Sequence, residues 1–155
     1  MNIELLAAGT KPPAWIEAGF GEYQKRLSGH WPLEVREIAV ARRGKNPALD
    51  RLKQEEGDRM LAAVRPGAKL VALDRTGTGW STETLAQRLD NWALSASHLQ
   101  IMIGGPDGLA QQCTDQASEV WSLSALTFPH FLVRVIVAEQ LYRAWTIQNN
   151  HPYHK

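Results

Sequence analysis

The densest group of chemically active side chains lies at the end of the sequence, in Asn149-Asn150-His151-Pro152-Tyr153-His154-Lys155. Histidine and tyrosine side chains suit proton transfer, and their rings suit stacking on a nucleic-acid base. The competing interpretation is a frayed terminus without function, which is the usual state of terminal residues. Because fraying does not require a Pro-Tyr-His run, we treat Tyr153 and His154 as candidate site residues.

Three charges precede this tail in a long apolar segment: Arg134, Glu139 and Arg143. A charge on an otherwise buried helix is costly unless it is paired or used, so we expect Glu139 to pair with one of the two arginines. Arg143 lies close to the tail. It could instead face an anionic substrate or a negative charge that develops during a reaction.

Two chain breaks after apolar runs are the natural floor and wall of a ligand site. The first, Gly104-Gly105-Pro106-Asp107-Gly108, matches neither the dinucleotide fingerprint nor the phosphate loop, which disfavours NAD and ATP. Its glycines let the backbone approach a ligand or another segment, although a plain tight turn explains them equally well. The second break, residues 122–130, has small residues whose main chain could read an adenine or a ribose. Its alternative is a strand end with a helix cap at Thr127.

Other candidates for chemistry are weaker. The loop Ala41-Arg42-Arg43-Gly44-Lys45-Asn46-Pro47 gathers three positive charges that could hold phosphates, or it is a solvated surface loop. His130, His151 and His154 have neither a neighbouring carboxylate nor helical histidine spacing, so we expect no metal site. Cys113 has no His or Lys beside it and is interpreted as a small filler residue rather than a nucleophile.

The elements that must position these residues alternate between strand and helix. The apolar pattern predicts strands over residues 3–8, 33–38, 70–73, 99–103 and 120–123. It predicts helices over residues 15–27 (capped by Thr10), 48–64, from Ser81 through residue 92, 109–118 and 131–145, with a flexible loop at 76–79. The fold class is therefore α/β, with a mostly parallel sheet and helices on both faces. The last helix is apolar on nearly every face, which favours covering by a second copy of the chain.

The composition limits the possible classes of protein. The 155 residues are most simply a single domain, and the hydrophobic fraction of 44% and charged fraction of 21% are typical of a globular protein. One cysteine excludes an intrachain disulfide. No apolar run approaches the ~20 residues of a membrane span, and no leader segment is recognisable, so we expect a cytoplasmic protein that does not contact membranes. A net charge of +1 gives no argument for nucleic acid, so any RNA contact must come from local patches.

The chain also resembles a known family, the small ribosomal RNA methyltransferase H family, which is part of the SPOUT class of trefoil-knotted methyltransferases. The resemblance runs essentially from end to end. It is carried by Leu6-Ala7-Ala8-Gly9-Thr10-Lys11, Arg43-Gly44-Lys45-Asn46, Ile103-Gly104-Gly105-Pro106-Asp107-Gly108, Trp121-Ser122-Leu123-Ser124-Ala125-Leu126-Thr127, Leu141-Tyr142-Arg143-Ala144-Trp145 and Asn150-His151-Pro152-Tyr153-His154.

The resemblance implies a homodimer that methylates N3 of a pseudouridine in large-subunit (23S) ribosomal RNA on the assembled ribosome. It implies S-adenosylmethionine as the methyl donor, no metal, and a C-terminal trefoil knot, which the general avoidance of knots would not suggest. The implied cofactor residues are Leu73, Gly104, Gly105, Leu123, Ser124, Ala125, Leu126, Thr127 and Phe128. The implied catalytic residues are Arg143, Tyr153 and His154, in a site completed across the dimer.

Two other classes of function compete with this one. A non-catalytic ribosome-binding factor on a methyltransferase scaffold would not bind S-adenosylmethionine. A small-molecule α/β enzyme, suggested by the weak net charge, would have negligible affinity for ribosomes even at low salt.

Overall fold

The structure is a computed structural model that describes residues 1–45 and 48–154. Asn46 and Pro47 of the basic loop and Lys155 of the tail lie outside the described residues. The described elements are, in order, β1 (Asn2–Ala8), α1 (Ala14–Leu27), β2 (Leu33–Ile38), α2 (Leu49–Ala62), β3 (Lys69–Gly79), α3 (Thr82–Ser95), β4 (His98–Ile103), α4 (Gln111–Gln116), β5 (Glu119–Ser122), α5 (His130–Gln148) and the 3-10 helix η1 (Pro152–His154). None of the described helices is long and apolar enough to cross a membrane.

The five strands form one sheet in the order β2-β1-β4-β3-β5, and each neighbouring pair is parallel. Ile3 of β1, for example, lies opposite Leu33 of β2 and Leu99 of β4. Because every strand runs in the same direction, the loops after β1, β3, β4 and β5 all leave from one edge of the sheet. This confirms the predicted α/β class and brings together the two chain breaks that the sequence singled out.

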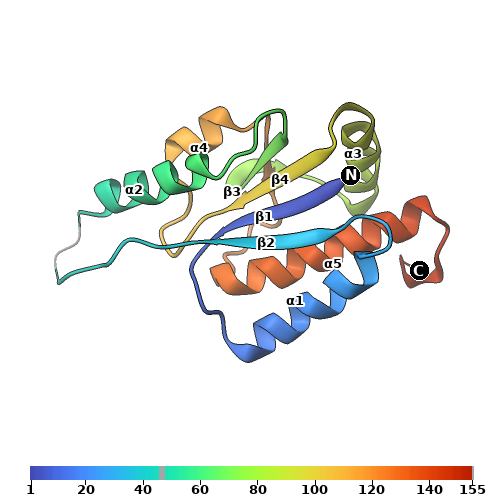
Figure 1. The fold of residues 1–155 in the computed structure, drawn as a ribbon, viewed down its shortest axis with the longest axis horizontal. Coiled ribbons are helices and arrows are strands. Elements are labelled where there is room, and N and C mark those ends of the chain that lie inside the picture. Colours follow the sequence, from blue (N-terminus) through green and yellow to red (C-terminus); the bar gives the residue numbers. More distant parts are fainter. Residues whose placement is uncertain (46–47, 155) are drawn as a thin grey trace.

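Helices cover both faces of the sheet, as predicted. Successive strand side chains point to opposite faces, so Leu5 and Ala7 of β1 join a core with α1, α3 and α5, whereas Leu6 and Ala8 join a second core with α2 and α4. Figure 1 shows α2 and α4 on one side of the sheet and α1 and α5 on the other.

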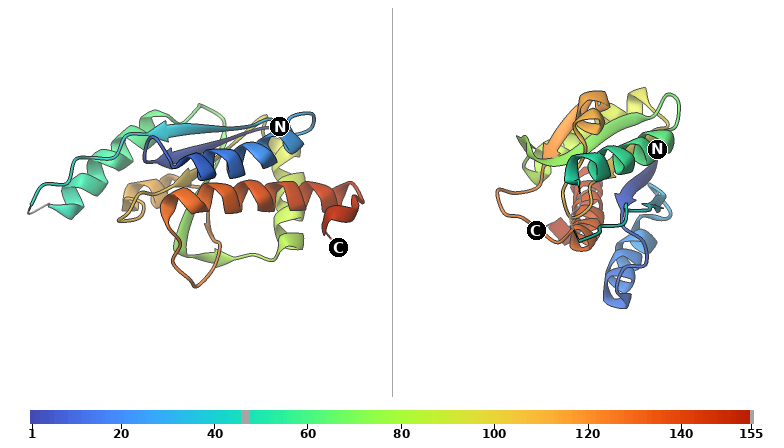
Figure 2. Two further views of the ribbon diagram at one scale, coloured as in Figure 1. Left: turned by 90° about the horizontal axis from the view of Figure 1, so that it is seen from below. Right: turned by 90° about the vertical axis from the view of Figure 1, so that its left-hand side faces the viewer.

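Helix α5 is the longest element and runs beneath the sheet beside α1, with the chain turning back at its end (Figure 2). Val137, Ala138 and Leu141 on its inner face are fully buried. On its outer face, Leu132 and Ile136 are half-buried and belong to neither core cluster. The expected covering of α5 on all sides is therefore only partly provided by this single chain.

The expected helix cap at Thr10 is wrong, and so is the alternative interpretation of Thr127 as a cap. Helix α1 begins at Ala14 with Pro13 at its N-cap, and α5 begins at His130 with Pro129 at its N-cap, and neither proline makes a side-chain cap bond. In each case proline, with its fixed φ, sets the start of the helix, so Thr10 and Thr127 lie too far back to cap it. The expected cap at Ser81 is confirmed, since its Oγ accepts a hydrogen bond from the Thr84 amide at 3.1 Å.

The predicted flexible loop at residues 76–79 is also wrong. Strand β3 continues to Gly79, and after an irregularity Thr78 pairs with Trp121 and Gly79 with Ser122 of β5. Close approach of the β5 backbone explains the glycine at position 77, because a Cβ at Gly77 would lie 2.7 Å from the Val120 carbonyl carbon. The helix predicted over 109–118 is shorter, since Leu109 and Ala110 are buried ahead of α4 rather than in it. The knot implied by the resemblance stays a prediction.

Candidate functional site

A cavity of about 1020 Å³ opens at the carboxyl edge of the sheet, within the size range of small-molecule sites. Its walls are the middle of β3, the segments that follow β4 and β5, part of α4 and the first turn of α5. All the predicted cofactor residues except Ala125 line it, namely Leu73, Gly104, Gly105, Leu123, Ser124, Leu126, Thr127 and Phe128. The fold thus joins three stretches of chain that are far apart in the sequence.

The turn after β4 brings bare backbone to this cavity. A Cβ on Gly104 would lie 2.5 Å from both the Gly108 carbonyl carbon and the Leu109 nitrogen, so no other residue fits without displacing the chain. The turn closes through a hydrogen bond from the Gly108 amide to the Gly105 carbonyl at 3.0 Å. Gly108 has a φ of +80°, which favours glycine.

The segment after β5 leaves its main chain available. Among the described residues, none makes a backbone-to-backbone hydrogen bond with residues 123–128. Two local bonds shape the segment, from the Leu126 amide to Ser124 Oγ at 3.0 Å and from the Ser122 hydroxyl to the Ser124 carbonyl at 3.2 Å. Apolar walls with open amides and carbonyls can hold a purine and read its edge.

Sequence reasoning missed Asp74 and Thr76, which line the cavity, and it included His130 only as the end of the 122–130 break and in a rejected metal site. Asp74 Oδ1 accepts hydrogen bonds from the Thr76 amide at 2.9 Å and the Thr76 hydroxyl at 2.6 Å, so it shapes the bend in β3. Its position directly after an apolar run was the available signal. Burial, and then the nearby positive charges of Arg134 and Arg43, lower the pKa of His130 and favour its neutral form.

A second cluster forms where the tail folds back on the end of α5. Arg143 donates to Glu139 Oε1 from Nε at 2.9 Å and from a terminal nitrogen at 2.5 Å, which confirms the predicted pairing of Glu139 with one arginine. The Tyr153 hydroxyl also donates to Glu139 Oε1, at 3.2 Å, and the Arg143 guanidinium lies 5.0 Å from the Tyr153 ring centroid. The tail is therefore ordered through η1 rather than frayed.

Protonation differs among the tail residues. Burial, a hydrogen bond with Tyr23 and the Glu139 carboxylate raise the pKa of Tyr153 well above its usual value, so its phenol keeps its proton. The Glu139 carboxylate likewise raises the pKa of Arg143. The Nδ1 atom of His154 is buried without a hydrogen-bond partner among the residues that the structure describes.

The two clusters do not meet within one chain. The cavity surrounds the first residue of α5, His130, whereas Arg143 lies roughly 20 Å further along the same helix at about 1.5 Å per residue. Arg143, Tyr153 and His154 are absent from the walls of the cavity. The cavity and the tail cluster therefore lie near opposite ends of α5.

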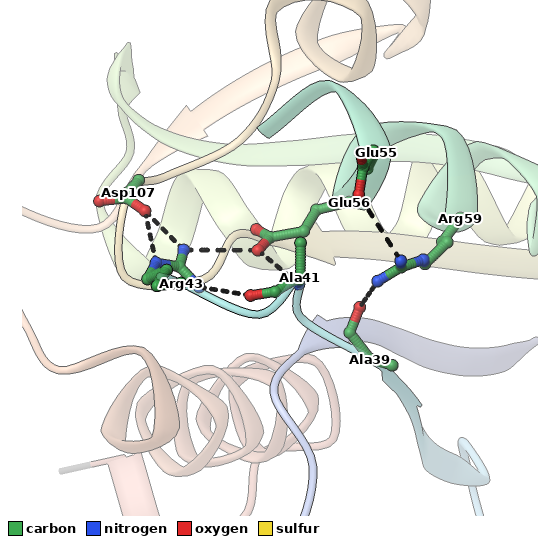
Figure 3. Close-up of polar contacts among 7 residues, drawn as sticks. All are labelled: Ala39, Ala41, Arg43, Glu55, Glu56, Arg59 and Asp107. Atoms are coloured by element: carbon green, nitrogen blue, oxygen red, sulfur yellow. Dashed lines mark hydrogen bonds and ion pairs between the residues drawn. The ribbon is translucent and has the colours of Figure 1, made fainter. Parts of the chain in front are cut away.

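Two of the weaker candidates, Arg43 and Cys113, have structural roles in the described chain. Arg43 of the basic loop is bound to Asp107 rather than free for phosphate, as drawn in Figure 3. Cys113 is buried in the second core, and burial raises its pKa to about 11, which confirms it as a filler residue. Within residues 1–45 and 48–154, no group of three or more His, Cys, Asp or Glu side chains could hold a metal ion.

A comparison with protein families adds the decisive observation. The family model described as "Predicted SPOUT methyltransferase" matches residues 1–154. The chain belongs to the SPOUT methyltransferase family. It is therefore an S-adenosylmethionine-dependent methyltransferase of a family that acts on RNA. This membership accounts for a cavity at the carboxyl edge that offers bare backbone and apolar walls.

The residues around the cavity fit S-adenosylmethionine. Leu73, Leu123 and Phe128 line the cavity with apolar surface that would suit the adenine, and residues 123–128 carry unpaired main-chain groups that would suit its polar edge. Gly104 and Gly105 have no side chains and would let a donor approach the backbone of the turn after β4.

Proposed function

We propose that this SPOUT methyltransferase methylates N3 of a pseudouridine in large-subunit ribosomal RNA, acting in the cytoplasm on the assembled ribosome. The observation that carries the proposal is the union of two distant segments, 104–105 and 123–128, around one cavity at the carboxyl edge of the sheet. The choice of acceptor rests on the end-to-end motif resemblance and on the Glu139–Arg143–Tyr153 cluster in the tail.

The reaction demands little beyond positioning. When bound, S-adenosylmethionine supplies an electrophilic methyl group on its sulfonium sulfur. The acceptor nitrogen must lie in line with that carbon and must lose its proton, so orientation and proton removal are the tasks left to the protein. Neither task requires a metal.

The tail residues divide these tasks by their chemistry. Arg143 stabilises the anionic base by facing its carbonyl oxygens, and Glu139 fixes the orientation of the guanidinium. Tyr153 keeps its proton and donates a hydrogen bond. Since neither Arg143 nor Tyr153 can accept the N3 proton, the proposal assigns that step to His154, directly or through water.

A homodimer supplies both clusters to one site. Leu132, Ile136, Glu139 and Arg143 follow one another at spacings of three or four residues, so they form one stripe along α5. The stripe combines two half-buried apolar side chains with the catalytic arginine. A second subunit packed on this stripe would bury the apolar pair and bring its tail to the cavity of the first.

The competing proposal is a ribosome-binding factor that keeps the scaffold without the reaction. Calorimetry with S-adenosylmethionine separates the two, since the ribosome-binding factor would not bind the donor with or without ribosomes.

The favoured proposal predicts binding of the donor to the protein and transfer of labelled methyl groups to assembled ribosomes. Mass spectrometry of the ribosomal RNA should show a gain of one methyl group on a single pseudouridine. Donor binding combined with methylation of a different nucleoside would refute the assigned acceptor while leaving the family function intact. The small-molecule alternative predicts negligible affinity for ribosomes, even at low salt.

A further inference from the structure

The turn at residues 104–108 contains one side chain able to tether it. Its sequence is Gly-Gly-Pro-Asp-Gly, and Asp107 is the residue that can form side-chain hydrogen bonds. Arg43 donates to Asp107 Oδ2 from Nε at 3.0 Å and from a terminal nitrogen at 2.5 Å. Both side chains are about a quarter exposed, at 26% each, so water screens this pair only in part. Charge-assisted contacts made by two nitrogens fix direction as well as distance.

Arg43 also makes contacts with the segment after β2 and with α2. Its other terminal nitrogen donates to the Ala41 carbonyl at 3.2 Å. The terminal nitrogen that binds Asp107 also lies 3.4 Å from Glu56 Oε1. The same Glu56 oxygen accepts the Ala41 amide at 3.0 Å. Figure 3 shows these contacts joining α2, the segment after β2 and the turn after β4.

Glu56 is unusual because it is only 4% exposed, yet it offers an acceptor that is not used. Its Oε2 has no hydrogen-bond partner within the described chain. That oxygen lies against the turn, since a Cβ at Gly105 would be 3.4 Å from it. Glu56 thus lies beside the first half of the turn and is linked to the second half through Arg43 and Asp107.

Buried ion pairs add little net stability, because desolvation offsets most of the attraction between the charges. What such a network does provide is a defined geometry. Here the geometry is that of the turn whose backbone lines the donor cavity, and Asp107 itself forms part of the cavity wall.

We propose that Arg43 and Glu56 are positioning residues for the methyl donor: through Asp107 they hold the 104–108 turn in the shape that receives S-adenosylmethionine. Neither residue lines the cavity, so both act through the turn. The proposal rests on the proposed function only in taking S-adenosylmethionine as the ligand of this cavity.

The test uses full-length protein carrying Asp107→Asn, which leaves Arg43 to compensate the buried Glu56 and so keeps the fold. Amide hydrogen exchange without donor should be faster at residues 104–110, and calorimetry should give about tenfold weaker S-adenosylmethionine binding. The Michaelis constant for ribosomes should not change. Arg42→Ala is the matched control, because Arg42 is an exposed neighbour in the same segment, and it should leave exchange and donor affinity as in the wild type.

A double-mutant cycle separates positioning from general stability. Arg43→Lys keeps the positive charge but loses the guanidinium group that contacts Asp107 through two nitrogens. It should weaken donor binding about tenfold, and this effect should not add to that of Asp107→Asn. Asp107→Glu should restore most of the affinity. Unchanged donor affinity in Asp107→Asn, or additive effects in the cycle, would overturn the proposal. Failure of the wild type to bind the donor would instead refute the proposed function, and the exchange measurement would still report on the tether.

Discussion

Glu139 is the residue on which the tail cluster converges, since a single oxygen accepts hydrogen bonds from both Arg143 and Tyr153. We expect Glu139→Gln to lower kcat by about 10- to 100-fold, because the guanidinium loses its fixed orientation while its charge remains. Arg143→Ala should lower kcat by orders of magnitude, because the variant lacks the positive charge that stabilises the anionic base. Donor affinity should hardly change in either variant, because the donor cavity lies at the other end of α5.

Steady-state methylation of ribosomes and calorimetry with S-adenosylmethionine measure these two effects. Glu55→Gln is a suitable control, because Glu55 also pairs with an arginine four residues away on a helix but lies far from the tail. Wild-type turnover in Arg143→Ala would show that the arginine is only structural.

Cys113 gives a prediction about stability and reactivity. Burial raises its pKa from 9.0 to about 11, so the folded state favours the protonated thiol. The stabilisation this provides is complete below pH 9 and is lost as the pH rises from about 9 to about 11. At pH 8 a thiol reagent should therefore modify the native protein very slowly and the urea-unfolded protein at once. Rapid modification of the native protein would contradict the burial of Cys113.

At the scale of elements, the turn after β4 depends on Gly104. We expect Gly104→Ala to abolish measurable donor binding, because its Cβ would lie 2.5 Å from the backbone on the far side of the turn. Displacing the turn should cost about 2 kcal/mol, which lowers Tm by roughly 4–8 °C and leaves the chain folded at 25 °C. Gly79→Ala is the control, since a Cβ there meets nothing within 4 Å, and it should bind donor normally. Calorimetry and thermal melts check both variants.

The sequence was informative wherever apolar runs ended abruptly. The predicted strands that end at Ile103 and Leu123 correctly placed two loops at one sheet edge, because parallel strands have their carboxyl ends at the same edge. The pairing of Glu139 with one of the two arginines was also predicted, because an unpaired charge on a buried helix is costly.

Contacts between distant segments could not be predicted in this way. The second half of β3 reads as a Thr-Gly-Thr-Gly loop, and it becomes a strand only because β5 lies beside it. The links from Glu56 and Arg43 to Asp107 join three elements, and no periodicity within any one of them reveals the contact. The starts of α1 and α5 were predicted to within one residue, but the N-cap positions of Pro13 and Pro129 were not, because threonine was considered as the capping residue.

At the scale of the whole molecule, α5 separates the donor cavity from the tail, and the outer stripe of α5 is where we expect the second subunit. Ile136→Glu should place a charge in that interface and shift the protein to monomers, as measured by light scattering during gel filtration. Methylation should be lost with dimerisation, whereas donor binding should persist. A dimeric Ile136→Glu protein with full activity would move the interface elsewhere.

The central claim is that one subunit holds the methyl donor and the other presents the catalytic tail. We expect the Gly104→Ala and Arg143→Ala proteins to be inactive when each is assayed alone. In the test, the two variants are unfolded together and refolded as a mixture, and mass spectrometry confirms that heterodimers have formed. Each heterodimer then contains one intact composite site, so methylation of ribosomes should return to about a quarter of the wild-type level. Heterodimers that form in full yield and remain inactive would contradict a site shared between subunits.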